Sequence, residues 1–397
     1  MRAEESRILV AASFGHFVCH YNVSVFPALV LPLAARLNLG TGQVIELSFL
    51  QYLLFGVSAL PWGLLGDRFG GTRLLILMFL GCSLAAVFAA LWIDSPTWLY
   101  LSLGGLGLFS GIYHPTGMAM ISKGVARVNL ALGYNAVFGG LGMVTAPLLT
   151  GFVNWLWSPS AAFLLVMGLN LLGIIILMPL LRSDPERQVT PKPETGIGMR
   201  VEFVIFLLAM VFAGMIITGS TVILPAYLEL RTDGLFHAME SLWGAKPSSN
   251  LFATAATALV YCVGMLGQFT GGIVGDRFKP ITSYLWFHFV CLFIALLMAF
   301  ARDLPLVLLA NVYFFFLLGT QAMENTVFAG LVPPRVHHSA FGIKYILYFG
   351  AGAFAVKMVG WIDSRWGSEA TFMGIAFVSA LLVITVRMLM LRIGKTA

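Results

Sequence analysis

Long apolar runs, separated by short charged or Gly/Pro-containing turns, dominate this chain of 397 residues. Hydrophobic residues make up 59% of the sequence and charged residues 10%, whereas a soluble surface needs roughly 25% charged residues. A bilayer-spanning helix takes about 20 apolar residues, so this content suffices for about twelve spans. The composition therefore predicts an all-α polytopic membrane protein and disfavours a secreted, disordered or nucleic-acid-binding chain.

Twelve apolar windows are predicted to form transmembrane helices, six on each side of a polar stretch. They fall at about 8–32, 45–66, 73–93, 97–122, 129–156, 160–181, 201–228, 250–274, 281–301, 304–330, 338–362 and 368–391. We expect an N-terminal six-helix bundle at 1–181, a cytoplasmic linker at 182–200 and a C-terminal six-helix bundle at 201–397. Because the first window lacks a small-residue cleavage site, we interpret it as a retained span and not as a signal peptide.

The positions of the basic residues predict the orientation of the chain. An even number of spans places both termini on one side of the membrane, and most of the 23 Lys and Arg residues belong to that side. They are Arg2, Arg7, Arg68, Arg73, Lys123, Arg127, Arg182, Arg187, Lys192, Arg200, Arg277, Lys279, Arg335, Arg387, Arg392 and Lys395. By the positive-inside rule both termini are cytoplasmic. The excess of positive charge thus predicts how the chain is oriented in the cytoplasmic membrane. It does not indicate a nucleic-acid partner.

The sequence also repeats itself at an offset of 209 residues. Gly-Asp-Arg-Phe at 66–69 recurs at 275–278, and Gly151 corresponds to Gly360. The second half carries its extra residues in the external loop 229–249. Two homologous halves predict a pseudo-twofold axis with a transport pathway between them.

The repeated segment joins spans 2 and 3 and, in its second copy, spans 8 and 9. Its motif residues are Gly63, Asp67, Arg68, Gly70, Arg73, Gly272, Asp276 and Arg277. The segment resembles the G-x-x-x-D-R-x-G-R signature of the major facilitator superfamily, and the resemblance covers the whole chain. It implies two six-helix bundles that alternate in access. It also implies that Asp67 and Asp276 latch the halves through helix starts near Ser339 and Asn129. The alternative is that these charges only mark topology.

Span 5 carries small residues at regular spacing, together with a proline. Gly133, Gly142, Pro147 and Gly151 resemble the G-x8-G-x3-G-P-x2-G-G motif of antiporters in the superfamily. Glycines at this spacing permit close helix packing and the proline permits a kink, which ordinary packing would also explain. The resemblance implies export.

Ionisable side chains within the predicted spans are candidates for proton coupling and substrate binding, because they are costly in hydrocarbon. They are His16, His20, His114, His288, Glu324, Lys344 and Lys357. The superfamily resemblance implies that spans 1, 4, 7 and 10 line the cavity, which favours His16, His20, His114 and Glu324. His16 and His20 lie four residues apart and share one helix face.

Several roles remain open for these groups. Histidine titrates near neutral pH, so it could exchange a proton, as could Glu324; each histidine could instead be a packing residue. Lys344, which aligns with Asn135 in the repeat, could pair with Glu324 or attract an anionic substrate, whereas Lys357 could extend outward. Metal ligation by His16, His20 and Glu324 is possible in residue type, but we predict no metal site. The four cysteines, Cys19, Cys82, Cys262 and Cys291, lie in apolar runs with no redox or zinc spacing.

Two further stretches look like fosmidomycin-resistance-type efflux proteins. They are the segment 15–32 of span 1, with its Gly-His and Pro residues, and the segment 111–117 of span 4. That family usually has an aspartate where His20 stands. Aromatic residues that could form an adaptable pocket, or simply pack helices, are Tyr21, Phe26, Tyr113, Phe138, Tyr345 and Phe349.

The sequence thus predicts a secondary transporter that works by alternating access. Its preferred function is proton-coupled efflux of a small organic molecule, with the proton gradient as the driving force and no cofactor. The expected partners are a small-molecule substrate and the lipid bilayer, and the chain is expected to be monomeric. The alternatives are uptake of an organic anion or metabolite, and a polytopic enzyme acting on lipid. The doubled signature disfavours the enzyme, as does the lack of a nucleophile–base motif.

Overall fold

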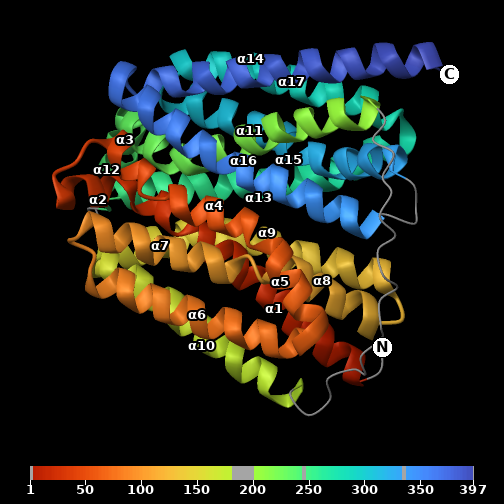
Figure 1. Cartoon of the computed structure of the whole chain (residues 1–397). Helices are drawn as coiled ribbons and strands as arrows, with labels where there is room; N and C mark the ends of the chain where they lie inside the picture. Colours follow the sequence, from red (N-terminus) through yellow and green to blue (C-terminus); the bar gives the residue numbers. More distant parts are fainter. Residues whose placement is uncertain (1–2, 181–200, 244–246, 333–336, 397) are drawn as a thin grey trace.

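The computed structural model describes residues 3–180, 201–243, 247–332 and 337–396, and within these ranges the regular structure is entirely helical (Figure 1). The N-terminal half contains α1 (Ala3–Ser24), η1 (Phe26–Leu29), α2 (Val30–Leu37), α3 (Thr41–Glu46), α4 (Phe49–Val57), α5 (Ala59–Phe69), α6 (Gly71–Leu91), α7 (Pro96–Ser110), α8 (Tyr113–Gly124), α9 (Val128–Leu156), α10 (Pro159–Leu177) and η2 (Met178–Leu180). The C-terminal half contains α11 (Val201–Arg231), α12 (Asp233–Trp243), α13 (Ser249–Arg277), α14 (Pro280–Phe300), α15 (Asp303–Leu331), α16 (His337–Trp366) and α17 (Ser368–Thr396). The predicted linker, 182–200, lies outside the described residues.

The helices reproduce the predicted set of spans. Ten described segments are each long and apolar enough to cross a membrane. An eleventh span is bent by 46° between Thr41–Val57 and Ala59–Phe69. The predicted fourth span is divided between α7 and α8. The twelve-helix membrane fold is therefore confirmed.

Prolines account for interruptions in the first, second and fourth spans. Proline has no backbone N–H and cannot continue a regular helical hydrogen-bond ladder. Pro115 cannot donate to the carbonyl of Gly111, and the helix accordingly stops at Ser110 and resumes at Tyr113. Pro27 lies in the short 3₁₀ segment η1, and Pro61 lies just after the bend between α4 and α5.

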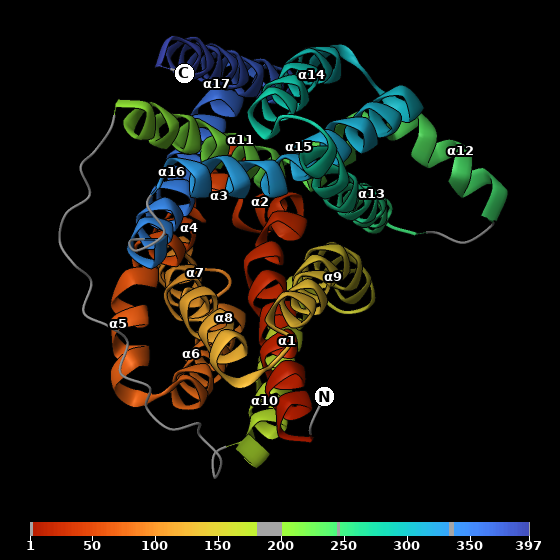
Figure 2. The same cartoon turned by 90° about the vertical axis from the view of Figure 1, so that its right-hand side faces the viewer.

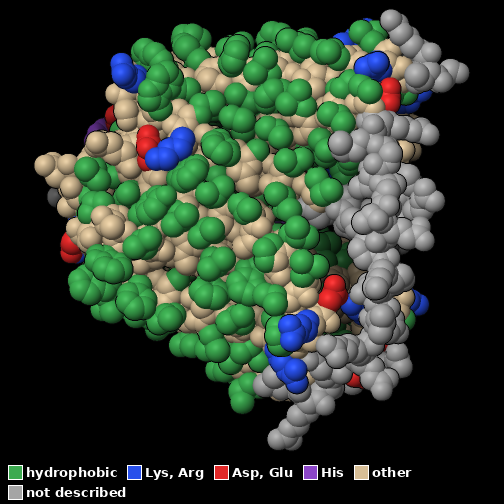
Figure 3. All heavy atoms as spheres, in the orientation of Figure 1, with side chains coloured by type: hydrophobic (Ala, Val, Ile, Leu, Met, Phe, Trp, Pro, Cys, Tyr) green, Lys and Arg blue, Asp and Glu red, His purple; other side chains and the backbone are tan. Residues whose placement is uncertain are grey.

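The outer surface is apolar, as a lipid-facing surface requires. Figure 3 shows hydrophobic side chains over most of the visible face, with charged groups toward its two ends. Large side chains such as Phe269, Phe300 and Leu91 are more than two-thirds exposed. In lipid these side chains are well solvated, whereas buried polar groups must find partners inside the protein.

Residues Asp233–Trp243, within the segment 229–249 that was predicted to be an external loop, form a helix that its polar sequence did not lead us to expect. α12 begins at Asp233, and the backbone N–H of Leu235 donates to Asp303 Oδ1 at 2.8 Å. Asp303 adopts a left-handed φ of 51° at the start of α15. The carboxylate thus satisfies a free N–H in the first turn of a neighbouring helix.

The two halves lie side by side, and both termini lie at the same end of the bundle (Figures 1 and 2). We call this the termini end and the opposite end, which carries α12 and the loops at 38–40 and 92–95, the distal end. Across the interface α9 packs against α13, and α16 packs against α3 and α4. The two pairs flank a central space, which holds the site described below.

Polar contacts join the halves at the distal end. Asn250 Nδ2 donates to the Ala28 carbonyl at 3.0 Å and to Glu229 Oε2 at 2.9 Å. Asn154 Nδ2 donates to Asn250 Oδ1 at 3.0 Å. Asn250 therefore connects four segments from both halves.

An ion pair adds a second distal connection. Lys357 Nζ lies 2.6 Å from Glu46 Oε2, which joins α16 to α3. The expectation that Lys357 extends outward was therefore incomplete, because a carboxylate of the other half lies within its reach. At the same interface Gly42 packs directly against the Gly360 backbone, where a side chain would not fit.

Candidate substrate site between the two halves

A cavity of about 400 Å³ lies between the two halves. Its walls contain the expected spans 1, 4, 7 and 10, and also spans 2, 5, 8 and 11. Residues from the N-terminal half include His16, His20, Ser24, Tyr52, Phe55, His114, Met118, Gly139 and Met143. Residues from the C-terminal half include Thr218, Tyr261, Met265, Gln268, Gln321, Glu324, Asn325, Lys344, Tyr345, Tyr348 and Phe349. All four ionisable residues of the predicted cluster, and Lys344, therefore line one cavity.

Three histidines meet on the N-terminal wall. His16 and His20 lie one turn apart on α1, and His114 lies on α8, which packs against α1. One ring nitrogen from each residue lies within 4.8 Å of the other two. His20 Nε2 is 3.1 Å from His16 Nε2. The sequence predicted the shared face of His16 and His20, and the structure adds the approach of His114.

The ring of His16 is held by neighbours on three sides. Its Nδ1 donates to the Asn135 carbonyl at 2.8 Å, and the Tyr113 ring stacks on it at 4.7 Å. Tyr113 in turn donates its hydroxyl to Asn135 Oδ1 at 2.7 Å. A carbonyl can only accept, so the Nδ1 proton is fixed and Nε2 of neutral His16 carries the lone pair. His20 Nε2–H is then the donor between the two histidines.

His114 is surrounded by aromatic rings from both halves. Phe55 meets it edge-on at 5.7 Å, and Tyr345 and Phe349 of α16 stack on it at 6.0 and 5.5 Å. Its Nε2 is buried and has no hydrogen-bond partner among the described residues. A buried nitrogen without a protein partner is costly, so this nitrogen is available to a bound molecule or to water.

An ion pair faces the histidines from the C-terminal wall. Lys344 Nζ lies 2.8 Å from Glu324 Oε1, and each side chain is only 4% exposed. Lys344 also donates to Asn325 Oδ1, and the Tyr284 hydroxyl donates to Glu324 Oε2 at 3.4 Å. The pairing of Lys344 with Glu324, one of the two roles considered for Lys344, is thus observed. Both charges are compensated within the protein.

The two polar clusters are related by the sequence repeat. Asn135 and Lys344 occupy equivalent positions at the offset of 209, and each contacts the preceding span of its own half. In the N-terminal half the partner is Tyr113, and in the C-terminal half it is Glu324. A neutral hydrogen bond in one half thus corresponds to an ion pair in the other.

Several predicted pocket residues lie outside the cavity lining. Tyr21, Tyr113 and Phe26 are all fully buried, and Tyr113 packs against the His16 ring. Each tyrosine follows or precedes a cavity histidine by one residue, which rotates its side chain by about 100° around the helix. Phe138 is 41% exposed on the outer surface. His288 is buried in α14 and is not part of the cavity wall.

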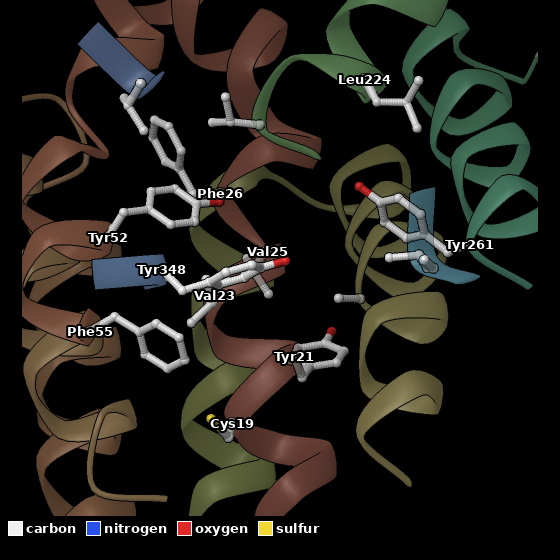
Figure 4. Packing of buried hydrophobic residues seen from close by; sticks show 14 of the residues in the cluster. Cys19, Tyr21, Val23, Val25, Phe26, Tyr52, Phe55, Leu224, Tyr261 and Tyr348 are labelled. Carbon is white, nitrogen blue, oxygen red and sulfur yellow. The ribbon is translucent and has the colours of Figure 1, made fainter. Parts of the chain in front are cut away.

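Tyr345 and Phe349 of span 11 line the cavity, as predicted, but the sequence did not single out Tyr52, Tyr261, Gln268 and Tyr348, from spans 2, 8 and 11, which also line it. Gln268 Nε2 donates to Gln321 Oε1 at 2.8 Å, within the C-terminal half. Tyr52, Tyr348 and Tyr261 extend from different helices toward the space between the halves (Figure 4). Neutral side chains are less costly in hydrocarbon than charged ones, so a search for ionisable residues within the spans does not find them.

The glycines of span 5 differ in what they contact. Gly142 packs against the Phe17 backbone of α1, and Gly151 packs against Thr254 of α13 in the other half. Gly133 faces open space, so its expected role in close packing is not seen in this conformation. Pro147 lies within α9, which continues through it from Val128 to Leu156.

The repeated signature residues lie at the termini end. Asp67 is exposed and lies 3.6 Å from Lys123 Nζ of its own half. Gly70 ends α5 with a φ of 87°, which favours glycine, and Gly63 lies close to Pro115. Arg73 donates to the Phe69 carbonyl at 3.4 Å, and Arg68 stacks on the Phe69 ring. In the second copy Gly272, Asp276 and Arg277 lie near the end of α13. The side chains of Ser339 and Asn129, the expected latch partners, lie outside the described residues.

The twelve-helix fold and the central cavity are features of a secondary transporter, and known proteins agree. The chain matches the family described as Major Facilitator Superfamily over residues 12–356. It therefore belongs to the major facilitator superfamily, as its signature predicted. The family assignment indicates a multi-pass membrane transporter and not an enzyme, with a small-molecule substrate.

The individual proteins that this chain resembles share little sequence identity with it. A multi-drug resistance efflux pump, PmrA of Streptococcus pneumoniae, is 23% identical over 378 residues, which cover 91% of this chain and 90% of the pump. A bacterial homologue of the human lysosomal transporter Spinster has a TM-score of 0.74 at 16% identity, covering 98% of this chain and 96% of its own. The nucleoside transporter NupG has a TM-score of 0.77 at 12% identity, with 96% and 99% covered.

Proposed function

We propose that this protein exports a small organic molecule across the cytoplasmic membrane in exchange for protons. The observation that carries the proposal is the ion pair between Glu324 and Lys344, which is buried in the wall of the cavity. An ionised pair inside a membrane protein is costly to desolvate, and its presence in a substrate cavity favours a functional role.

The ion pair provides a way to couple the binding of substrate to the binding of a proton. Protonation of the Glu324 carboxylate removes its charge and leaves Lys344 without its counter-ion. The protonated site thus presents the positive charge of Lys344 to the cavity, whereas the ion-paired site has no net charge. The ion-paired site favours the substrate, and the site without substrate favours the proton. When the cavity faces the cytoplasm, substrate binds as the proton leaves; when it faces outward, a proton replaces the substrate.

Export, and not uptake, is favoured by two findings. The similarity to a multi-drug efflux pump extends over nearly the whole chain. In addition, Lys344 is engaged by Glu324 and Asn325 in the ion-paired state that binds substrate, so this state does not present an uncompensated positive charge to an organic anion. The aromatic and methionine side chains of the wall suit an apolar or aromatic molecule, because such side chains adapt to different shapes.

The transport cycle uses the two halves as rocking units, 1–181 and 201–397, joined by the linker 182–200. The excess of basic residues on the side of the termini supports a cytoplasmic position for both. The described contacts at the distal end then correspond to a conformation closed toward the outside. Asp67 and Asp276 latch the termini end in the opposite conformation, and the protein acts as a monomer.

Flux out of loaded proteoliposomes tests the direction of transport. A thermal-shift screen of the purified protein first identifies a compound that binds. With an inward-directed proton gradient, the proposal predicts that vesicles loaded with this compound expel it faster than vesicles without a gradient. Accumulation under the same gradient would identify a symporter and contradict the proposal. Formation of a lipid product without flux would instead support the enzyme.

A further inference from the structure

We propose that His16, His20 and His114 form a binding site for a divalent transition-metal ion of the Zn²⁺ class, open on one side to the cavity. This site is separate from the Glu324–Lys344 pair, so the inference goes beyond the proposed function and does not depend on it. From the sequence, metal ligation by His16, His20 and Glu324 was possible in residue type, and no metal site was predicted. In the structure Glu324 is paired with Lys344, and His114 takes that position.

The spacing of the three imidazoles fits metal ligation. Zn–N bonds of about 2.0–2.1 Å in a tetrahedral site place ligand nitrogens about 3.3 Å apart. The Nε2 atoms of His16 and His20 are 3.1 Å apart, and one nitrogen from each of the three histidines lies within 4.8 Å of the other two. A small rotation of one ring therefore closes the site. Two histidines at i and i+4 on one helix are a common arrangement for two zinc ligands.

The surroundings of His16 orient it as a ligand. Its Nδ1–H donates to the Asn135 carbonyl, which leaves the Nε2 lone pair directed at His20. Metal-bound histidines commonly donate their second nitrogen to a carbonyl in this way, which fixes the tautomer and the ring orientation. Stacking by Tyr113 holds the same ring from the side.

The remaining two histidines supply the other lone pairs. His114 Nε2 is buried and has no partner among the described residues, so a metal ion would satisfy it. His20 binds after its proton moves from Nε2 to Nδ1, which changes the tautomer but not the net charge. The ion then displaces a hydrogen bond between two neutral rings and gains three nitrogen ligands.

The chemistry of the site limits which ions bind. Imidazole nitrogens suit Zn²⁺, Co²⁺, Ni²⁺ and Cu²⁺, whereas Mg²⁺ and Ca²⁺ prefer oxygen ligands. Three protein ligands leave a fourth position, which faces the cavity because all three histidines line it. Water or a donor atom of a bound molecule would occupy it, as in zinc sites that keep an open position.

Equilibrium binding to the whole purified protein tests the site. The protein is prepared without a polyhistidine tag, and Zn²⁺ is titrated by calorimetry, with Mg²⁺ as a separate probe. We expect saturable binding of one Zn²⁺ per chain and none of Mg²⁺. Each of His16→Gln, His20→Gln and His114→Gln should weaken binding at least about tenfold. His237→Gln, in the exposed part of α12, is the matched control and should bind as the wild type does.

Absence of saturable Zn²⁺ binding to the wild type would overturn the site. Full affinity in the His114→Gln variant would overturn it equally. Because a variant could fail to fold, Co²⁺ provides a measurement on the wild type alone. A site with three imidazoles and four-coordinate geometry should give intense visible absorption bands, whereas the weak spectrum of six-coordinate, water-ligated Co²⁺ would contradict the proposal.

Discussion

At the scale of single residues, the Glu324–Lys344 pair carries the proposed mechanism. Each charge compensates the other in a site that water reaches poorly, since both side chains are 4% exposed. Removal of one partner leaves the other buried and unpaired, whereas removal of both removes the desolvation cost as well. Stability and proton coupling can therefore be separated by mutation.

Glu324→Gln should lower the free energy of unfolding by about 3–5 kcal/mol and abolish proton-driven flux, because Lys344 loses its counter-ion. The double variant Glu324→Met, Lys344→Met should recover most of the thermal stability but not the coupling. Thermal melting in detergent and flux in proteoliposomes measure the two properties. Proton-driven flux in the double variant would contradict the assignment of coupling to this pair.

The sequence located most of these residues but could not place them relative to one another. Helical periodicity alone put His16 and His20 on one face, and the repeat aligned Asn135 with Lys344. The approach of His114 depends on how α8 packs on α1, which periodicity does not specify. Tyr21, Tyr113 and Phe138 were assigned to the pocket by residue type, and their side chains point elsewhere because adjacent residues face different sides of a helix.

At the scale of helices, glycines determine how closely the halves approach. A side chain at Gly56 of α4 would lie 2.7 Å from the Phe349 carbonyl carbon and 2.8 Å from the Gly350 Cα of α16. These are backbone atoms, which cannot rotate away. A side chain at Gly350, in the same contact, would meet nothing within 4 Å. The two glycines therefore form a matched pair for mutation.

Gly56→Ala should separate α4 from α16 and destabilise the protein by about 1–3 kcal/mol, as overpacking of a well-packed interface does. Gly350→Ala should leave stability unchanged or raise it slightly, because alanine favours helix. Melting temperatures of both variants provide the comparison. If both variants lost the same stability, the close approach of Gly56 to the α16 backbone would not be the cause.

Helix positions were predictable from the sequence, but helix breaks were less so. The windows matched the observed spans because hydrocarbon imposes their length. The breaks at Pro27 and Pro115 follow from proline chemistry, although the sequence also contains Pro147 and Pro225 within continuous helices. Whether a proline interrupts a helix depends on the neighbours that satisfy the released carbonyl, and these neighbours belong to the tertiary structure.

At the scale of the whole molecule, Asn250 is the centre of a hydrogen-bond network that joins the two halves at the distal end. Its side chain bonds to Ala28 and Asn154 of the N-terminal half and to Glu229 of its own half. Asn311, by contrast, donates within its own helix, to the Val307 carbonyl at 2.8 Å. The distal closure should therefore depend on one asparagine and not on the other.

Asn250→Ala should shift the population toward conformations open at the distal end. Spin labels at cysteines introduced for Thr97 and Arg365, in a Cys262→Ser background, report the distal separation. Cys262 is exposed and the other three cysteines are buried. We expect longer distances in Asn250→Ala and the wild-type distribution in Asn311→Ala. An unchanged distribution in Asn250→Ala would mean that other contacts hold the distal end.

Proton movement driven by substrate alone tests the central claim of proton-coupled export most directly. Proteoliposomes with a trapped pH-sensitive dye, pyranine, receive on the outside the compound identified by thermal shift, with no initial pH difference. Because an antiporter exchanges substrate for protons, entry of the compound should make the lumen more alkaline in the wild type and leave it unchanged in Glu324→Gln. Acidification of the lumen, or the same alkalinisation in Glu324→Gln, would contradict the proposed mechanism.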